Sequence, residues 1–268
     1  MYDCYSHMEP KTALVLSAGG MFGAYQAGAW QALAGSLRPD IVIGTSVGAL
    51  NAWAIAGGCS PDELVRRWTD PSAAAFLRLR TPIFPWRPCF DHYSFLHHVQ
   101  ELFAAFRSQM PCGVVMIDLL NRRPRLVQSP DIRWEHLAAA CAIPLGVPPV
   151  RVDGRLYVDG GLLNVAPLWA ATEMGAARAV VVNALPRLQS PLVRAAVWAM
   201  RSISPRPPEW GDLDVVTIAP SAPLGSLQES VCWDRDVVLR SIERGAADAR
   251  RVMTERQAGR DPAEPVLQ

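Results

Sequence analysis

The residues best suited to chemistry lie within positions 41–53, which read IVIGTSVGALNAW. Ser46 stands between Gly44 and Gly48, after a β-branched run that predicts a strand and before residues that predict a helix. Glycines on both sides permit the sharp turn of a nucleophile elbow, which exposes a serine hydroxyl at a helix N-terminus. The motif therefore favours Ser46 as a nucleophile. An ordinary glycine-rich turn with a serine cap is the alternative, since GxSxG by itself is frequent.

A second motif, SAGGMFG at positions 17–23, is also predicted to lie between a strand and a helix. Its glycines free backbone N–H groups to point at a ligand, which suits an oxyanion hole or a phosphate cradle. The spacing differs from GxGxxG, and the Lys-Ser/Thr ending of a P-loop is missing. These departures exclude the dinucleotide fingerprint and the P-loop. A tight turn without a ligand is the alternative.

A third motif places Asp159 directly after a predicted strand and before Gly160 and Gly161. A carboxylate in this position is held by a rigid element and is open to approach from the glycine side. The alternative is an aspartate that caps its own turn, which is common in Asp-Gly sequences.

Together, the three motifs resemble the patatin-like phospholipases. SAGGMFG, GTSVG and DGG occur in that family's order and approximate spacing, and the stretch 139–168 resembles the family's sequence around its aspartate. The resemblance covers about 12–253. It implies a three-layer α/β/α fold and a Ser–Asp dyad that hydrolyses lipid acyl esters through an acyl-enzyme intermediate.

Carried over by motif, the resemblance makes Ser46 the nucleophile and Asp159 its base, and it places Gly19, Gly20 and Met21 in the oxyanion loop. The remaining motif glycines are Gly23, Gly44, Gly48, Gly160 and Gly161. Two positions depart from the family pattern. Ala18 replaces a glycine and Phe22 replaces a cation, which leaves the backbone N–H donors of the loop in place.

The histidines agree with a dyad that lacks one. The order Ser, acid, His is usual in an α/β-hydrolase, but no histidine follows Asp159. Each histidine of the chain is therefore interpreted as a surface or packing residue. These residues are His7, His92, His97, His98 and His136.

Composition narrows the class of protein. Half of the 268 residues are hydrophobic and the formal net charge is +1, so a sizeable core is expected and nucleic acid is not expected as a partner. The six cysteines form no CxxC pair, and neither a metal nor another cofactor is predicted. No apolar run approaches the ~18 residues of a membrane span, and no signal sequence is recognised. A cytoplasmic protein is the expectation.

Predicted strands alternate with predicted helices, which is typical of a mainly parallel sheet covered on both faces. Strands are expected at 13–16, 41–43, 114–117, 124–128, 179–183 and 215–218, with a hairpin at 151–158. Helices are expected at 24–37, after Ser46, after Ser60, and at 91–106, 134–141, 189–203 and 234–253. We expect a single domain at 12–255, with flexible tails at 1–11 and 256–268.

The expected substrate is a lipid or fatty-acyl ester. The loop 80–90 and the helix 189–203 mix aromatic and basic residues, which suits a transient contact with a membrane surface. Packing of these aromatics in the core is the alternative. Two other functions are compatible with the motifs: an acyltransferase or thioesterase that uses the same dyad, and a catalytically idle lipid-binding protein.

Overall fold

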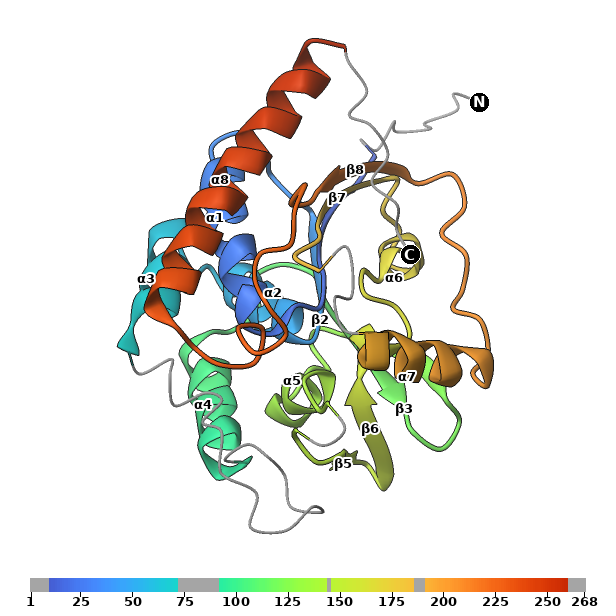
Figure 1. Cartoon of the computed structure of the whole chain (residues 1–268). Coiled ribbons are helices and arrows are strands. Elements are labelled where there is room, and N and C mark those ends of the chain that lie inside the picture. Colours follow the sequence, from blue (N-terminus) through green and yellow to red (C-terminus); the bar gives the residue numbers. More distant parts are fainter. Residues whose placement is uncertain (1–9, 72–91, 144–145, 186–190, 260–268) are drawn as a thin grey trace, which may run out of the picture.

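The computed structural model describes residues 10–71, 92–143, 146–185 and 191–259. An eight-stranded sheet lies at its centre (Figure 1). The strands are β1 (Thr12–Leu16), β2 (Ile41–Thr45), β3 (Cys112–Asp118), β4 (Arg123–Gln128), β5 (Val150–Val152), β6 (Arg155–Asp159), β7 (Arg178–Val182) and β8 (Asp214–Ile218).

The sheet combines a parallel centre with antiparallel additions. Five strands run parallel in the order β3-β2-β1-β7-β8. β4 and β6 both pair antiparallel with β3, and β5 forms the predicted hairpin with β6. The α/β class is therefore confirmed, with a mixed sheet at the end nearest β3.

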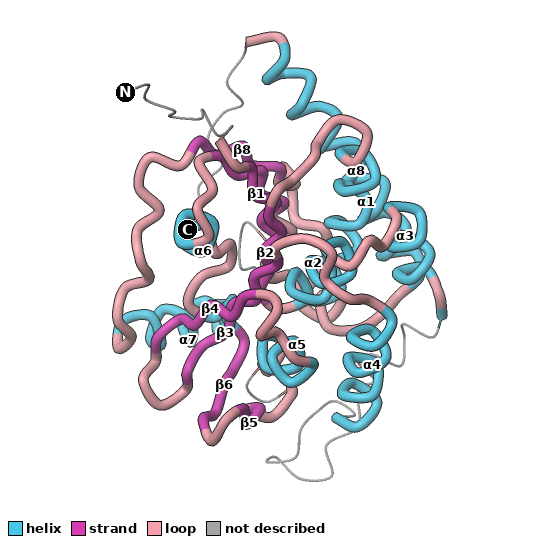
Figure 2. The backbone as a smooth tube through the Cα atoms, turned by 180° about the vertical axis from the view of Figure 1, so that it is seen from behind, coloured by secondary structure: helices cyan, strands magenta, loops and turns pink. Residues whose placement is uncertain are grey.

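Helices cover both faces of the sheet. α1, α2, α3 and α8 lie on one side, and α6 and α7 lie on the other, as both views show (Figures 1 and 2). The helices are α1 (Gly23–Leu33), α2 (Val47–Ala56), α3 (Pro61–Thr69), α4 (His92–Ala105), α5 (Trp134–Ala140), α6 (Leu168–Glu173), α7 (Pro191–Ser202) and α8 (Arg235–Gln257). This is the three-layer arrangement that the motifs predicted.

β1 shows why the sheet has two apolar faces. Its side chains alternate: Leu14 and Leu16 join the core beneath α1 and α2, whereas Ala13 and Val15 join the core beneath α6. Successive side chains of a strand point to opposite faces, so a strand covered on both sides is apolar throughout.

Close backbone contact joins α8 to α1. A Cβ atom on Gly28 of α1 would lie 2.0 Å from the carbonyl oxygen of Ile242, and one on Gly245 of α8 would lie 2.0 Å from that of Tyr25. Glycine at both positions lets the two helices pack at a distance that a side chain would prevent. α8 thereby covers the outer surface of α1, the helix that directly follows the 17–23 motif.

The structure differs from the sequence predictions at α1 and α6, and one predicted loop falls outside it. α1 ends at Leu33 rather than at 37, because the chain turns at 34–36. α6 was not predicted, since only six residues form it, directly after Pro167. The loop 80–90 lies outside the described residues. Within the described ranges, no helix is long and apolar enough to cross a membrane.

Candidate active site

Ser46 sits at a strained turn between β2 and α2. Its φ of 55° and ψ of −138° are rarely adopted by a residue with a side chain, and such strain is common at functional sites. A Cβ atom on Gly44 would lie 2.1 Å from the carbonyl oxygen of Gly48, and one on Gly48 would lie 2.4 Å from that of Leu16. Both glycines of GxSxG are therefore required by packing at the turn.

The sheet brings Ser46 and Asp159 together because two strands share one edge of β3. β2 pairs with β3 as far as Thr45 opposite Val115. β6 takes over at the next residue of β3, where Asp159 lies opposite Met116. β4 occupies the other edge of β3 along 113–118. β2 and β6 therefore meet end to end along this edge of β3. Ser46 directly follows β2 and Asp159 is the last residue of β6, so the two residues lie where the strands meet.

The Asp159 carboxyl group is buried and hydrogen-bonded. Its residue is 2% exposed. The carboxylate accepts hydrogen bonds from the Ser46 hydroxyl and from the backbone N–H of Gly161, the latter at 2.7 Å. Burial raises the pKa of Asp159 to about 7, while these two hydrogen bonds act in the opposite direction. Near neutral pH this carboxyl group therefore both holds and releases a proton readily.

Gly160 and Gly161 pack the third motif against the other two. A Cβ atom on Gly160 would lie 2.4 Å from Oγ1 of Thr45, and one on Gly161 would lie 2.5 Å from Cβ of Ala18. The residue before the serine and the first loop thus both touch the DGG turn. The three motifs therefore lie together in one cluster.

The 17–23 loop has two free amide donors among the described residues. The N–H of Ala18 donates to Val165 O at 2.9 Å, and that of Met21 donates to Ser230 O at 2.8 Å. The amides of Gly19 and Gly20 form no hydrogen bond with an acceptor in the described part of the chain. Met21 was expected alongside them, but in this structure its amide is engaged by the segment before α8.

A buried polar network holds this loop, and sequence reasoning missed it. Gln26 Nε2 donates to Ser17 O at 2.7 Å, and Asn51 Nδ2 donates to Gly23 O at 3.0 Å. Asn51 also donates to Gln26 Oε1 at 2.9 Å and accepts from Trp68 Nε1 at 3.1 Å. Gln26 and Asn51 are buried polar residues in helices whose other buried residues are mainly apolar, and this was the signal available in the sequence.

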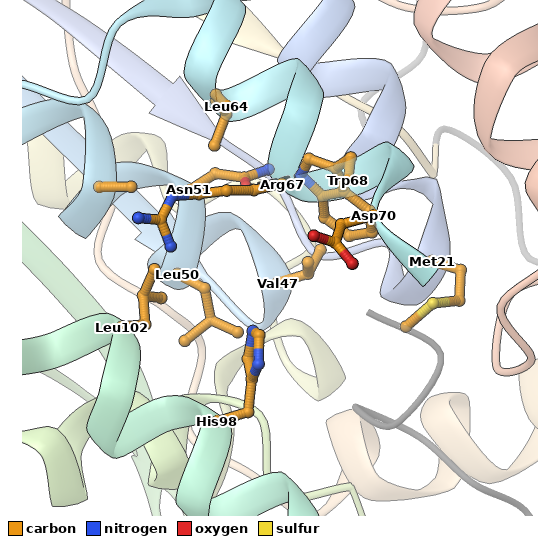
Figure 3. Close-up of a pocket in the computed structure, with 11 residues that line it drawn as sticks. Met21, Val47, Leu50, Asn51, Leu64, Arg67, Trp68, Asp70, His98 and Leu102 are labelled. Carbon is orange, nitrogen blue, oxygen red and sulfur yellow. Dashed lines mark hydrogen bonds between the residues drawn. The ribbon is translucent and has the colours of Figure 1, made fainter. Parts of the chain in front are cut away.

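A cavity of about 160 Å³ opens beside Val47, the residue after Ser46, between α2, α3 and α4 (Figure 3). Met21 of the loop and Val47, which follows Ser46, are among the residues that line it. Most of its surface is apolar. Its lining is Met21, Val47, Leu50, Asn51, Ala54, Leu64, Arg67, Trp68, Asp70, His98 and Leu102.

The histidines have separate roles in packing and at the cavity. Nδ1 of His136 accepts the backbone N–H of Arg133 at 3.0 Å, at the start of α5. His97 pairs with Glu101 at the surface. His98 lines the cavity, which the sequence did not predict. Burial is the main cause of the lowered pKa of His98. His7 lies outside the described residues.

Groups that bind metals do not gather at the site. Among the described side chains, no cluster of three or more His, Cys, Asp or Glu residues is arranged to hold a metal ion. The groups that the described residues bring together here are the Ser46 hydroxyl, the Asp159 carboxyl group of raised pKa, and backbone amides.

Comparison with known proteins relates the chain to a protein family. The sequence model of the patatin-like phospholipases matches residues 14–172. Patatin-like phospholipase domain-containing protein 7 of Rattus norvegicus is 26% identical over 180 residues, which are 64% of this chain and 13% of that protein. An uncharacterised NTE family protein of Mycobacterium bovis is 30% identical over 164 residues, 59% of this chain and 45% of its own.

Among solved structures, VipD from Legionella pneumophila superposes with a TM-score of 0.57 at 12% identity, over 92% of this chain and 67% of that chain. At this identity the likeness concerns the fold alone. The family match is of a different kind, because it spans more than half of the chain and contains both Ser46 and Asp159. The chain belongs to the patatin-like phospholipase family.

Proposed function

We propose that the protein hydrolyses carboxylic esters of phospholipids or lysophospholipids through Ser46 and Asp159. The observation that supports this most directly is the hydrogen bond between the two side chains, made by a buried carboxyl group with a pKa of about 7. A base is most effective when its pKa lies near the working pH. An ordinary surface aspartate, with a pKa near 4, would be a poor acceptor for a hydroxyl proton.

In the first step Ser46 Oγ attacks the ester carbonyl carbon, and its proton passes to the Asp159 carboxylate. The carbonyl oxygen becomes an oxyanion, for which the free amides of Gly19 and Gly20 are the donors. One such donor typically contributes about 3–4 kcal/mol to the transition state. When the bond to the leaving alcohol breaks, that alcohol takes the proton from Asp159 and the acyl group stays on Ser46.

In the second step a water molecule replaces the alcohol. Asp159 accepts a proton from the water as its oxygen attacks the acyl carbon. The bond to Ser46 Oγ then breaks, the serine recovers the proton and the fatty acid leaves. The same carboxyl group thus serves as base and then as acid in each half of the reaction.

The cavity beside Ser46 is the space that we assign to the acyl chain. Its lining includes Met21 and Val47, the residues next to the proposed oxyanion donors and the proposed nucleophile, and most of its lining is apolar. An apolar cavity of about 150 Å³ holds a molecule the size of benzene. A space of 160 Å³ therefore suits roughly the first six carbons of an acyl chain.

The decisive test combines labelling with turnover. Wild-type protein, Ser46→Ala and Asp159→Asn are treated with a fluorophosphonate probe and assayed on phospholipids, lysophospholipids and p-nitrophenyl esters. We expect labelling to vanish in Ser46→Ala, and hydrolysis to fall at least about 10³-fold in both variants. Circular dichroism and thermal unfolding check that each variant is folded. Unchanged turnover in either folded variant would refute the dyad.

A further inference from the structure

β3 carries a turn beyond the edge of the sheet at which Ser46 lies. The strand pairs with β2 only as far as Val115 and continues to Asp118. The carboxyl ends of parallel strands meet at one edge of the sheet, so the turn after β3 projects past the dyad. At its tip, Leu120 is 75% exposed and Leu119 is 37% exposed. Two adjacent leucines therefore present apolar surface to solvent at this turn.

α7 adds two more exposed apolar residues on the same side of the molecule. Trp198 is 70% exposed, and Ile203, just past the helix end, is 63% exposed. α7 contacts the short 3-10 helix Gly160–Leu162, which directly follows Asp159. The helix is therefore attached to the strand end that supplies the proposed base.

The turn and the helix belong to one surface. Pro205, which follows α7, lines the same surface hollow as Leu120, Arg122 and Arg123 of the turn. Both views of the backbone place α7 beside the end of β3 (Figures 1 and 2). We call the β3–β4 turn and α7, with the residues to 206, the docking face.

Positive charge is concentrated on the docking face although the whole chain has a formal net charge of only +1. Its hollow is lined by four arginines and a single acid, Asp118, which Arg155 neutralises at 3.1 Å. In the described ranges, no carboxylate pairs with the other three, Arg122, Arg123 and Arg125. Arg206 is also exposed beside Pro205.

We infer that the docking face binds the surface of an anionic lipid bilayer. Leucine and tryptophan enter the interfacial zone, and unpaired arginines bind headgroup phosphates. This inference rests on the proposed function, because it places the dyad at the surface that supplies its substrate. The mixture of exposed apolar tips with a surplus of arginines is what distinguishes a lipid surface from a neutral protein partner.

The test measures binding rather than turnover, in the Ser46→Ala background so that lipid is not consumed. Flotation with phosphatidylcholine vesicles is compared with flotation with phosphatidylcholine–phosphatidylglycerol vesicles. We expect binding to the anionic vesicles only, weakening as salt is raised. Arg122→Glu with Arg123→Glu should lower this binding about tenfold or more. Leu120→Ser with Trp198→Ser should lower it several-fold.

Matched controls lie on the other side of the sheet. Arg235→Glu with Arg250→Glu reverses two exposed charges on α8, and Tyr93→Ser removes an aromatic that is 80% exposed on α4. These controls should leave vesicle binding unchanged. Equal binding to neutral and anionic vesicles, no binding to either, or an equal loss in the controls would overturn the inference.

The outcome is independent of the proposed hydrolysis. If the wild-type protein cleaves soluble p-nitrophenyl esters but does not float with anionic vesicles, the docking face is refuted and the dyad stands. If the protein floats as expected but cleaves no ester, the dyad is refuted and the docking face stands.

Discussion

The two sides of Ser46 differ in how their polar groups are satisfied. Towards α1 and α2, Gln26, Asn51 and Trp68 are buried, and their side chains hold the 17–23 loop and one another. Towards the β3–β4 turn and α7, apolar side chains are exposed, and Arg122, Arg123 and Arg125 form no ion pair with a carboxylate of the described residues. On the first side the members of this network bond one another, whereas the second side is suited to a partner.

This difference separates two contributions to activity. Buried, fully bonded groups resist movement because breaking one bond leaves a costly unpaired partner. They are therefore suited to fixing catalytic geometry, and changes there should affect every substrate. Changes on the docking face should affect only substrate that is presented in a bilayer.

The largest effect expected on the buried side is that of pH. In the proposed mechanism, hydrolysis of a soluble ester requires ionised Asp159, whose pKa is about 7. We expect kcat/KM to fall about tenfold per pH unit below 7 and to level off above it. A soluble substrate is used so that lipid binding does not contribute. A pH profile that is flat between 5 and 8 would contradict the role given to Asp159.

Stability should change with pH in the opposite direction to activity. Burial raises the pKa of Asp159 above its ordinary value of 3.8, so the folded state binds more protons than the unfolded state. The stabilisation of the protonated form is complete below about pH 4 and is lost as the pH rises through about 7. Asp159→Asn should remove this part of the pH dependence of thermal unfolding.

Next in size is the effect of the buried network. Gln26→Leu should lower kcat about tenfold on soluble and vesicle substrates alike, because Ser17 O and Asn51 lose a partner and the loop shifts. Gln31→Leu is the matched control, since Gln31 lies on the same helix but is exposed and bonds Asp62. If the two substitutions lower kcat equally, Gln26 has a role in folding alone.

The smallest effect concerns the cavity. Ala54→Leu places three further carbon atoms in a space of 160 Å³. Across a series of p-nitrophenyl esters, we expect the long chains to lose several-fold in kcat/KM while acetate is unchanged. Ala247→Leu, on the exposed side of α8, controls for added bulk. If all chain lengths lose equally, the acyl chain lies elsewhere.

The sequence predicted the parts of the site that are encoded locally. Ser46, Asp159 and their glycines belong to short motifs whose turns are determined by adjacent residues, and the structure places these motifs together. The Gln26–Asn51–Trp68 network could not be predicted in the same way, because its members come from three helices that meet only in the packed fold. The engagement of Met21 by Ser230 likewise joins segments far apart in the chain.

The fold shows the same division. Alternating strands and helices predicted the layers. No local feature of the sequence predicted that β6 would pair with the same edge of β3 as β2, beginning one residue after the pairing with β2 ends. His98 was placed away from the site because residue spacing on one helix does not reveal what that helix faces. Short α6 was missed because six residues carry little periodicity.

The meeting of β2 and β6 on one edge of β3 has a consequence for errors in folding. A shift of one residue in the pairing of β6 would turn Asp159 to the opposite face of the sheet, away from Ser46. A misregistered molecule would then contain an intact elbow and an intact aspartate but no dyad. The hydrolytic activity proposed for this protein therefore depends on the register of β6 against β3, and a measurement of activity would also report whether that pairing is correct.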